Sequence, residues 1–188
     1  MEGKVCNWDP LSCQSLLGYG RAAHERSGGV CAYCGLGSDG VTFDLWRQLT
    51  VDHVIASNTI GPGGLGKLIR AKCFPNLPEG ELKKLFESIN RINLVTACSF
   101  CNSMTSRKRT RSIHEIMPDE PSEEVVAADH PLVEALLSRL EQLVDVERKD
   151  KVKYVQARLD TLKEYFDGQI VRVLVSLPGK IPGGMGGS

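Results

Sequence analysis

Two Cys-x-x-Cys pairs constrain the fold of this chain more than any other feature. The first pair is Cys31 and Cys34, and the second is Cys98 and Cys101. Four thiolates from two such pairs can close a tetrahedral zinc site that leaves no coordination position open. The spacing therefore predicts a structural zinc ion that clamps together the two ends of the intervening segment.

Cysteine usage also bears on the compartment. The chain has seven cysteines, an odd number, and four of them fall in the two pairs. The first residues show no apolar run behind Lys4, and no stretch approaches eighteen uninterrupted apolar residues. We therefore expect no signal peptide, no membrane span and a reducing, cytoplasmic compartment. Cys6, Cys13 and Cys73 are expected to act as small buried hydrophobes.

Charge is distributed unevenly along a chain that is neutral overall. Residues 1–114 hold 14 Lys and Arg against 9 Asp and Glu, and residues 115–188 hold 9 against 14. The densest basic stretch comprises Arg107, Lys108, Arg109 and Arg111. Alone it would suit a solvated helix face, but the basic excess in this half favours contact with a polyanion such as DNA.

Hydrophobic spacing predicts a mixed set of elements. Helices are expected over residues 12–26, 79–91, 99 to about 113, 131–146 and 152–166, the last two as separate helices or as one long helix with a phase slip at 147–151. Strands are expected at 41–43, 49–51, 93–97 and 170–177. Residues 61–66 are expected as a flexible loop, 115–130 as an acidic linker or surface loop, and 178–188 as a flexible Pro/Gly-rich tail.

The segment between the cysteine pairs carries an Asp–His pair, Asp52 and His53, at the end of a predicted strand. Hydrolysis of a phosphodiester needs a base for water and a divalent cation for the developing charge. A neutral imidazole suits the first role, so His53 is the candidate base. Asp52 should point to the other side of the strand, and with the amide oxygen of Asn102 it could hold Mg²⁺ or Mn²⁺. Asn93 could fix the adjacent loop through backbone hydrogen bonds.

The whole pattern resembles the HNH endonuclease family, the zinc-containing branch of the ββα-metal nucleases. It reads Cys-x2-Cys, then Val-Asp-His-Val at 51–54, then Asn-Leu-Val-x-Ala-Cys-x2-Cys-Asn at 93–102, and the match covers about residues 31–111. The resemblance implies an α+β fold, in which a ββα-metal core is stapled by the four-cysteine zinc site and flanked by an N-terminal helix and C-terminal helices. The nuclease domain would span residues 1–114, followed by the linker and a helical extension at 131–177.

The resemblance also implies roles for individual residues. His53 would be the general base and Asp52 the metal-binding acid. Asn93 would be the central asparagine of the His-Asn-His motif, and Asn102 would stand at the position of its second histidine. The four cysteines would be the zinc ligands. The chain departs from the pattern in two places. A long insert separates His53 from Asn93, and Thr105 stands where many members have Lys.

These observations lead us to expect a metal-dependent DNA endonuclease that leaves 5′-phosphate and 3′-hydroxyl ends. By analogy, its setting would be restriction, phage defence or a mobile element. Two alternatives stay open: a catalytically inactive, zinc-stabilised nucleic-acid-binding module, and the effector nuclease domain of a larger regulated assembly. Val152, Val155, Leu159, Leu162 and Phe166 are separated by alternately three and four residues, which gives a narrow apolar stripe on a helix. This stripe further predicts a homodimer through residues 131–177.

Overall fold

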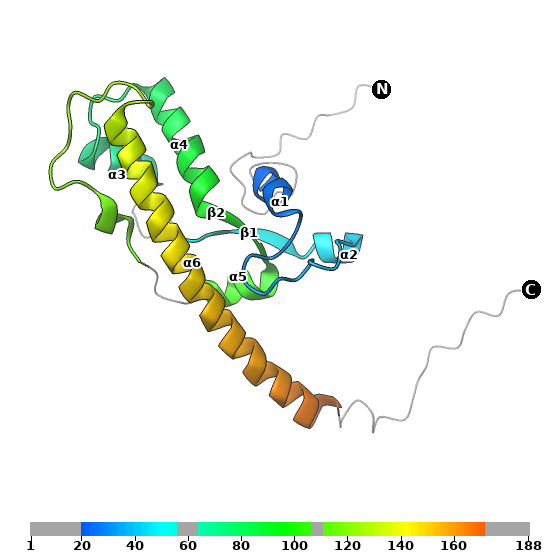
Figure 1. The fold of residues 1–188 in the computed structure, drawn as a ribbon. Helices are drawn as coiled ribbons and strands as arrows, with labels where there is room; N and C mark the ends of the chain where they lie inside the picture. The colour runs from blue at the N-terminus through cyan, green and yellow to red at the C-terminus, as the bar shows by residue number, and fades with distance from the viewer. Residues whose placement is uncertain (1–19, 56–63, 107–110, 172–188) are drawn as a thin grey trace, which may run out of the picture.

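A computed structural model describes residues 20–55, 64–106 and 111–171 of the chain. These residues form several helices around a small antiparallel sheet (Figure 1). The helices are α1 (Arg21–Ser27), α2 (Phe43–Trp46), α3 (Gly64–Lys72), α4 (Glu79–Asn93), α5 (Ser99–Thr105) and α6 (Pro131–Tyr165), with single turns η2 (Ile113–Ile116) and η3 (Phe166–Ile170). In the described part of the chain, no helix is both long and apolar enough to cross a bilayer.

The sheet consists of β1 (Leu49–His53) and β2 (Leu94–Cys98). The strands run antiparallel, with Leu49 opposite Cys98 and His53 opposite Leu94. The strands predicted at 49–51 and 93–97 are thus confirmed, with ends that differ by one or two residues. Helix α5 follows β2 without a loop and contacts both strands. The register places the end of β1, with Asp52 and His53, beside the start of β2.

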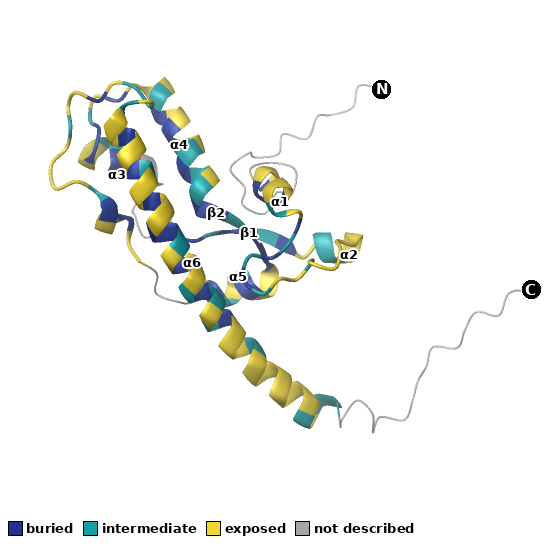
Figure 2. Ribbon diagram, in the orientation of Figure 1, coloured by how far each residue is buried: buried dark blue, intermediate teal, exposed yellow. Residues whose placement is uncertain are grey.

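The two longest helices, α4 and α6, lie side by side and bury a common apolar core (Figure 2). Helix α4 was expected over 79–91, and its apolar residues Leu82, Leu85 and Ile89 are buried. Helix α6 is continuous from Pro131, so the option of one long helix is the correct one. A proline in the first turn favours this start, because its missing N–H would have no partner there.

This core crosses the predicted boundary between nuclease domain and extension. Ile116 and Val125 from the acidic stretch are buried in the same cluster as residues of α4 and α6. The backbone N–H of Ser122 also donates to the carbonyl of Cys73 at 2.8 Å. Residues 115–130 therefore run along the surface of the described unit and contribute apolar side chains to its interior.

Several predicted elements are corrected. Residues 41–43 are not a strand, because the Thr42 side chain accepts a hydrogen bond from the Leu45 N–H and starts α2. The helix after the second cysteine pair ends at Thr105, so Arg111 does not lie on it. Gly64 begins α3 rather than lying in a loop.

At the chain ends, only parts of two predictions can be compared. Ile170 belongs to the helical turn η3 and not to a strand, whereas 172–177 lie outside the described residues. The first helix is described from Arg21, and 12–19 lie outside the described residues. Its predicted end is confirmed, since Gly28 takes a left-handed backbone conformation with φ 61°.

The apolar stripe in the second half of α6 is used in two ways. Val152, Val155 and Leu159 pack against the cluster that contains the four cysteines. Beyond Leu159 the helix projects from the body (Figure 2), and Leu162, Tyr165 and Phe166 are 45%, 55% and 47% exposed. The inner part of the stripe therefore packs on its own chain, and only its end is open for an intermolecular contact.

The homodimer stays a prediction, and the structure sharpens its test. If this end of α6 joins two copies, Leu162→Asp together with Phe166→Asp should turn a dimer into a monomer, because each copy would bury two charges in the interface. Sedimentation at tens of micromolar measures the change. Leu132→Asp, at the exposed start of α6, is the matched control. A parent protein that sediments as a monomer would contradict the prediction.

Candidate functional site

The four paired cysteines meet in space. Their Sγ atoms all lie within 4.8 Å of one another, and those of Cys34 and Cys98 are 3.9 Å apart. A tetrahedral zinc with Zn–S bonds of about 2.3 Å needs its sulfurs about 3.8 Å apart. Cys31, Cys98 and Cys101 are buried and Cys34 is half-buried. The donor set therefore fits a closed, structural metal ion such as zinc.

Backbone geometry prepares the sulfurs for a metal. The N–H of Cys98 donates to Sγ of Cys31 at 3.3 Å, and the N–H of Cys101 donates to Sγ of Cys98 at 3.5 Å. Hydrogen bonds from the thiols of Cys101 and Cys98 lower the pKa of the Cys31 thiol, which favours its thiolate form. The first pair sits in a tight loop that requires Gly37, where a Cβ atom would meet the carbonyl oxygen of Gly29 at 2.7 Å. Apolar side chains, among them Val152, Val155 and Leu159 of α6, pack against the cluster.

Strand β1 divides the candidate residues between its two faces. Successive side chains of a strand point to opposite sides, so Thr50 and Asp52 share one face. Helix α5 lies on this face, because Asn102 donates to Oγ1 of Thr50 at 2.9 Å and Thr105 donates to Oδ2 of Asp52 at 3.3 Å. Alternation places His53 on the other face. The structure thus brings Asp52 and Asn102 to one side of the strand, and the alternation places His53 on the other.

Asp52 is a meeting point of several segments. Its Oδ2 atom accepts from the hydroxyl of Tyr33 at 2.5 Å and from the ammonium of Lys151 at 2.8 Å, besides Thr105. Burial and the negative charge of Asp52 raise the pKa of Tyr33, so this hydroxyl stays protonated and donates. Tyr33 comes from the first cysteine loop, Thr105 from α5 and Lys151 from α6. The carboxylate therefore ties these three segments to β1.

This arrangement does not fit a divalent cation on Oδ2 of Asp52, because an ammonium already holds that oxygen. The side-chain amide of Asn102 is also not oriented to bind a cation beside Oδ2 of Asp52. Its amide nitrogen donates to the carbonyl of Val51 at 3.2 Å, as well as to Thr50. A backbone carbonyl can only accept, so the NH₂ group faces the strand and the amide oxygen faces away. Asp52 and Asn102, which the sequence predicts to hold Mg²⁺ or Mn²⁺, are neighbours, but Lys151 holds Oδ2 of Asp52 and the amide nitrogen of Asn102 is the atom that faces the strand.

His53 ends β1 and is half-buried. Burial lowers the pKa of its imidazole below the usual 6.5; the charge of Asp52 opposes this shift, and the charge of Lys151 adds to it. The ammonium of Lys151 also donates to the His53 carbonyl at 3.3 Å. The imidazole is therefore neutral near pH 7, the state in which it can accept a proton.

Asn93 fixes the segment that follows β1. Its amide oxygen accepts from the N–H of Ile55 at 2.8 Å, and its amide nitrogen donates to the carbonyl of Ile55 at 2.9 Å. The backbone carbonyl of Asn93 accepts from the N–H of Val54 at 2.9 Å. These are the backbone hydrogen bonds expected from the sequence. They hold Val54 and Ile55 against the end of α4.

We predict that Asn93→Ala lowers the free energy of unfolding by about 2–4 kcal/mol, because the buried N–H and carbonyl of Ile55 would both lose their partner. Urea denaturation measures the change. Asn90→Ala, one turn earlier on α4, is the control, with an expected change within about 0.5 kcal/mol. Equal stability of Asn93→Ala and the parent would show that the pairing with Ile55 contributes nothing.

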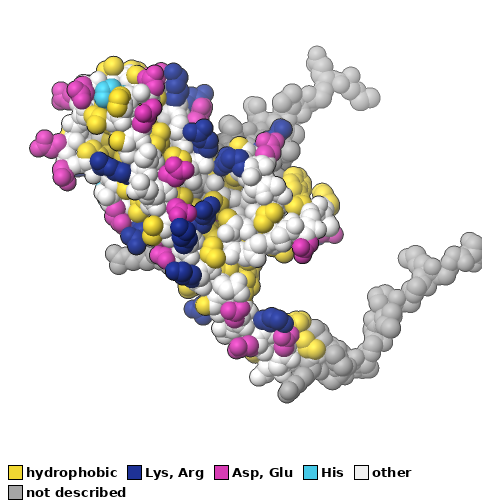
Figure 3. Space-filling view, in the orientation of Figure 1, with side chains coloured by type: hydrophobic (Ala, Val, Ile, Leu, Met, Phe, Trp, Pro, Cys, Tyr) yellow, Lys and Arg dark blue, Asp and Glu magenta, His cyan; other side chains and the backbone are white. Residues whose placement is uncertain are grey.

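The predicted DNA contacts are described only at Arg111, since Arg107, Lys108 and Arg109 lie outside the described residues. Arg111 precedes η2, and its guanidinium lies 3.5 Å from the carboxylate of Glu115. On the face shown in Figure 3, Lys and Arg side chains over α4 and α6 are interspersed with Asp and Glu. The described part of this face therefore offers no uniformly basic surface.

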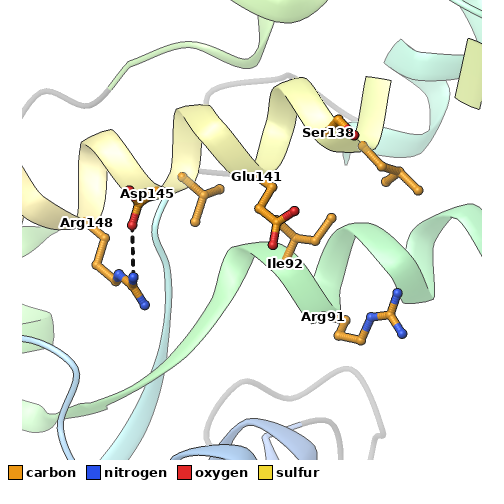
Figure 4. Close-up of a pocket in the computed structure, with 8 residues that line it drawn as sticks. Arg91, Ile92, Ser138, Glu141, Asp145 and Arg148 are labelled. Carbon is orange, nitrogen blue, oxygen red and sulfur yellow. Dashed lines mark hydrogen bonds and ion pairs between the residues drawn. The ribbon is translucent and has the colours of Figure 1, made fainter. Parts of the chain in front are cut away.

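A groove of about 540 Å³ lies between α4 and α6 (Figure 4). It is lined by Arg91, Ile92, Leu137, Ser138, Glu141, Val144, Asp145 and Arg148. This set contains two arginines and two carboxylates, and Arg148 is paired with Asp145 at 3.0 Å. The lining contains none of the predicted site residues. Its balanced charge does not suit a polyanion.

Sequence reasoning missed the residues that surround Asp52. Tyr33 lies inside the first Cys-x-x-Cys pair, and Thr105 was noted only as a departure from the family pattern. Lys151 lies at the predicted phase slip of α6, where the apolar spacing breaks. The break in the apolar spacing was the one sequence feature that could have indicated Lys151. A charged residue that interrupts the apolar face of a helix can lie against a buried partner of opposite charge.

The described residues thus combine helices, a small antiparallel sheet and a four-cysteine cluster that could hold a metal ion such as zinc. Asp52 and His53 lie on the strand that this cluster supports, and Asn93 and Asn102 lie next to that strand. Comparisons of the chain with family models, curated proteins and solved structures gave no match.

Proposed function

We propose that the protein is a DNA endonuclease of the HNH type, which hydrolyses phosphodiester bonds with His53 as the general base. The observation that carries this proposal is the position of the Asp52–His53 strand end. The strand pairs with β2, and both cysteine pairs and α5 surround it. Helices α3 and α4 stand between the two paired strands in the chain, and α5 follows β2. A pair of antiparallel strands with a helix after the second is compatible with the ββα-metal core that the resemblance implies.

In the proposed reaction, the neutral imidazole of His53 removes a proton from water. The water oxygen attacks phosphorus, the bond from phosphorus to the 3′ oxygen breaks, and that oxygen takes a proton from solvent. The products carry a 5′-phosphate and a 3′-hydroxyl. Asn93 holds the backbone next to His53 in place, since it binds both polar groups of Ile55. Zinc would take no part in the chemistry, because four thiolates leave it no open position. The resemblance implies a divalent cation, which would stabilise negative charge on the phosphate when bound.

Cleavage of supercoiled plasmid tests the proposal. Zinc-loaded protein should nick or linearise the plasmid with Mg²⁺ or Mn²⁺, and EDTA at a concentration that spares the zinc should stop it. A protein that binds DNA without cutting would support the first alternative, an inactive zinc-stabilised module. Cleavage that appears only after a partner is added would support the second, an effector domain in a larger assembly. Restriction, phage defence or a mobile element remains the proposed setting by analogy.

The proposed DNA contacts give a further prediction. If Arg107, Lys108, Arg109 and Arg111 bind phosphates, the loss of any one should weaken DNA binding equally for all sequences and lower the salt slope by about one. Arg111→Ala should have the smallest effect, because Glu115 already offsets its charge. Fluorescence anisotropy at several salt concentrations measures both quantities. An altered sequence preference with the same salt slope would point instead to base recognition.

A further inference from the structure

Lys151 is the most deeply buried charged side chain near the proposed site. It is 1% exposed, in the middle of α6. A lysine withdrawn from water keeps its charge only when a partner compensates it. Here the ammonium lies 2.8 Å from Oδ2 of Asp52, 3.3 Å from the carbonyl oxygen of His53 and 5.7 Å from the centre of the Tyr33 ring. These contacts hold the Lys151 side chain at the strand end.

Oδ2 of Asp52 has no room for a second cation. It accepts from the ammonium of Lys151 and from the hydroxyls of Tyr33 and Thr105. A magnesium or manganese ion bonds to oxygen at about 2.1 Å and would have to take a lone pair that one of these donors uses. The ion would also stand within a few ångströms of the ammonium, in a buried place where repulsion between like charges is weakly screened.

We infer that Lys151 and a divalent cation exclude each other at Oδ2 of Asp52, so that the cation can bind this oxygen only when Lys151 leaves it. Lys151 thus sets the affinity of the site for the cation. The inference rests on the proposed function in one respect only, namely that the protein uses a divalent cation. It also makes α6 part of the site, although the motif ends long before this helix begins.

Manganese binding to the full zinc-loaded chain tests the inference without reference to cleavage. Electron paramagnetic resonance of free Mn²⁺ gives the dissociation constant. Lys151→Met should tighten Mn²⁺ binding by at least about tenfold, within the range typical of coupling between two ligands. Lys149→Met removes an exposed lysine of the same helix and should leave the constant unchanged. Adding Asp52→Asn to Lys151→Met should abolish the gain.

Thermal unfolding provides a second measurement in case Lys151→Met is unstable. A ligand that binds only the folded state raises the melting temperature. Mn²⁺ should therefore raise the melting temperature of Lys151→Met well above its effect on the parent. Lys151→Gln, which keeps a donor for Asp52 but no charge, serves the same purpose if the Met variant does not fold. Equal Mn²⁺ affinity and equal thermal response of the parent and the variants would overturn the inference, whether or not the protein cuts DNA.

Discussion

Replacing His53 with Ala should lower the rate of DNA cleavage by ~10²–10⁴-fold, the usual effect of removing a general base. Affinity for DNA should stay nearly the same, because the imidazole would act only in the chemical step. Single-turnover cleavage, with binding measured separately, distinguishes the two effects. Because burial lowers the pKa of His53 below 6.5, the imidazole stays mostly neutral at pH 6.5, and the parent should still cleave there.

Two controls make this result specific. His114→Ala removes an exposed histidine outside the site and should leave the rate unchanged. The zinc content of His53→Ala should equal that of the parent, since no cysteine is altered. If zinc-loaded His53→Ala cleaves as fast as the parent, His53 is not the base and the HNH assignment fails.

Replacing Cys98 with Ser should remove zinc and much of the stability together. Metal binding is coupled to folding in sites of this kind, with apparent binding energies of about 10–16 kcal/mol for structural zinc in small modules. Cys98 also ends β2 and caps α5 through its sulfur. We therefore expect a loss of several kcal/mol in the free energy of unfolding, together with misplacement of Asn102. Elemental analysis and thermal unfolding measure both.

Cys73→Ala is the matched control for this prediction. Cys73 is buried in the main core, and burial raises the pKa of its thiol to about 11. The variant should lose about 1 kcal/mol through the missing contacts and keep all its zinc. A Cys98→Ser protein that keeps both zinc and stability would show that the four cysteines do not form the metal site.

Local patterns were enough to predict the elements around the site. The apolar spacing of α4 and α6 produces these helices because each buries its apolar face. The short apolar runs of β1 and β2 produce strands that are buried along most of their length. The Cys-x-x-Cys pairs predicted that residues 31–34 and 98–101 would meet, since one metal needs all four sulfurs. The strand predicted at 41–43 failed because the hydroxyl of Thr42 starts a helix there. The hydrogen bond that the Thr42 side chain accepts from the backbone outweighed the preference of threonine for strands.

The surroundings of Asp52 could not be predicted in the same way. Lys151 reaches Asp52 only because α6 packs over both the main core and the cysteine cluster. No local pattern records which residue of a long helix will pass a strand that is far away in the sequence. The motif was enough to predict that Asp52 lies at the end of a strand. It could not predict that the buried ammonium of Lys151 lies beside Asp52.

Cleavage of a DNA duplex in ¹⁸O-labelled water tests the central claim most directly. The zinc-loaded parent, with Mg²⁺ or Mn²⁺, should release 5′-phosphate ends that carry ¹⁸O and unlabelled 3′-hydroxyl ends, because water attacks phosphorus and the 3′ oxygen leaves. The same protein with His53→Ala should release almost none. Mass spectrometry of the products reads both results. No labelled 5′-phosphate from a folded, zinc-loaded parent with either cation would contradict the account.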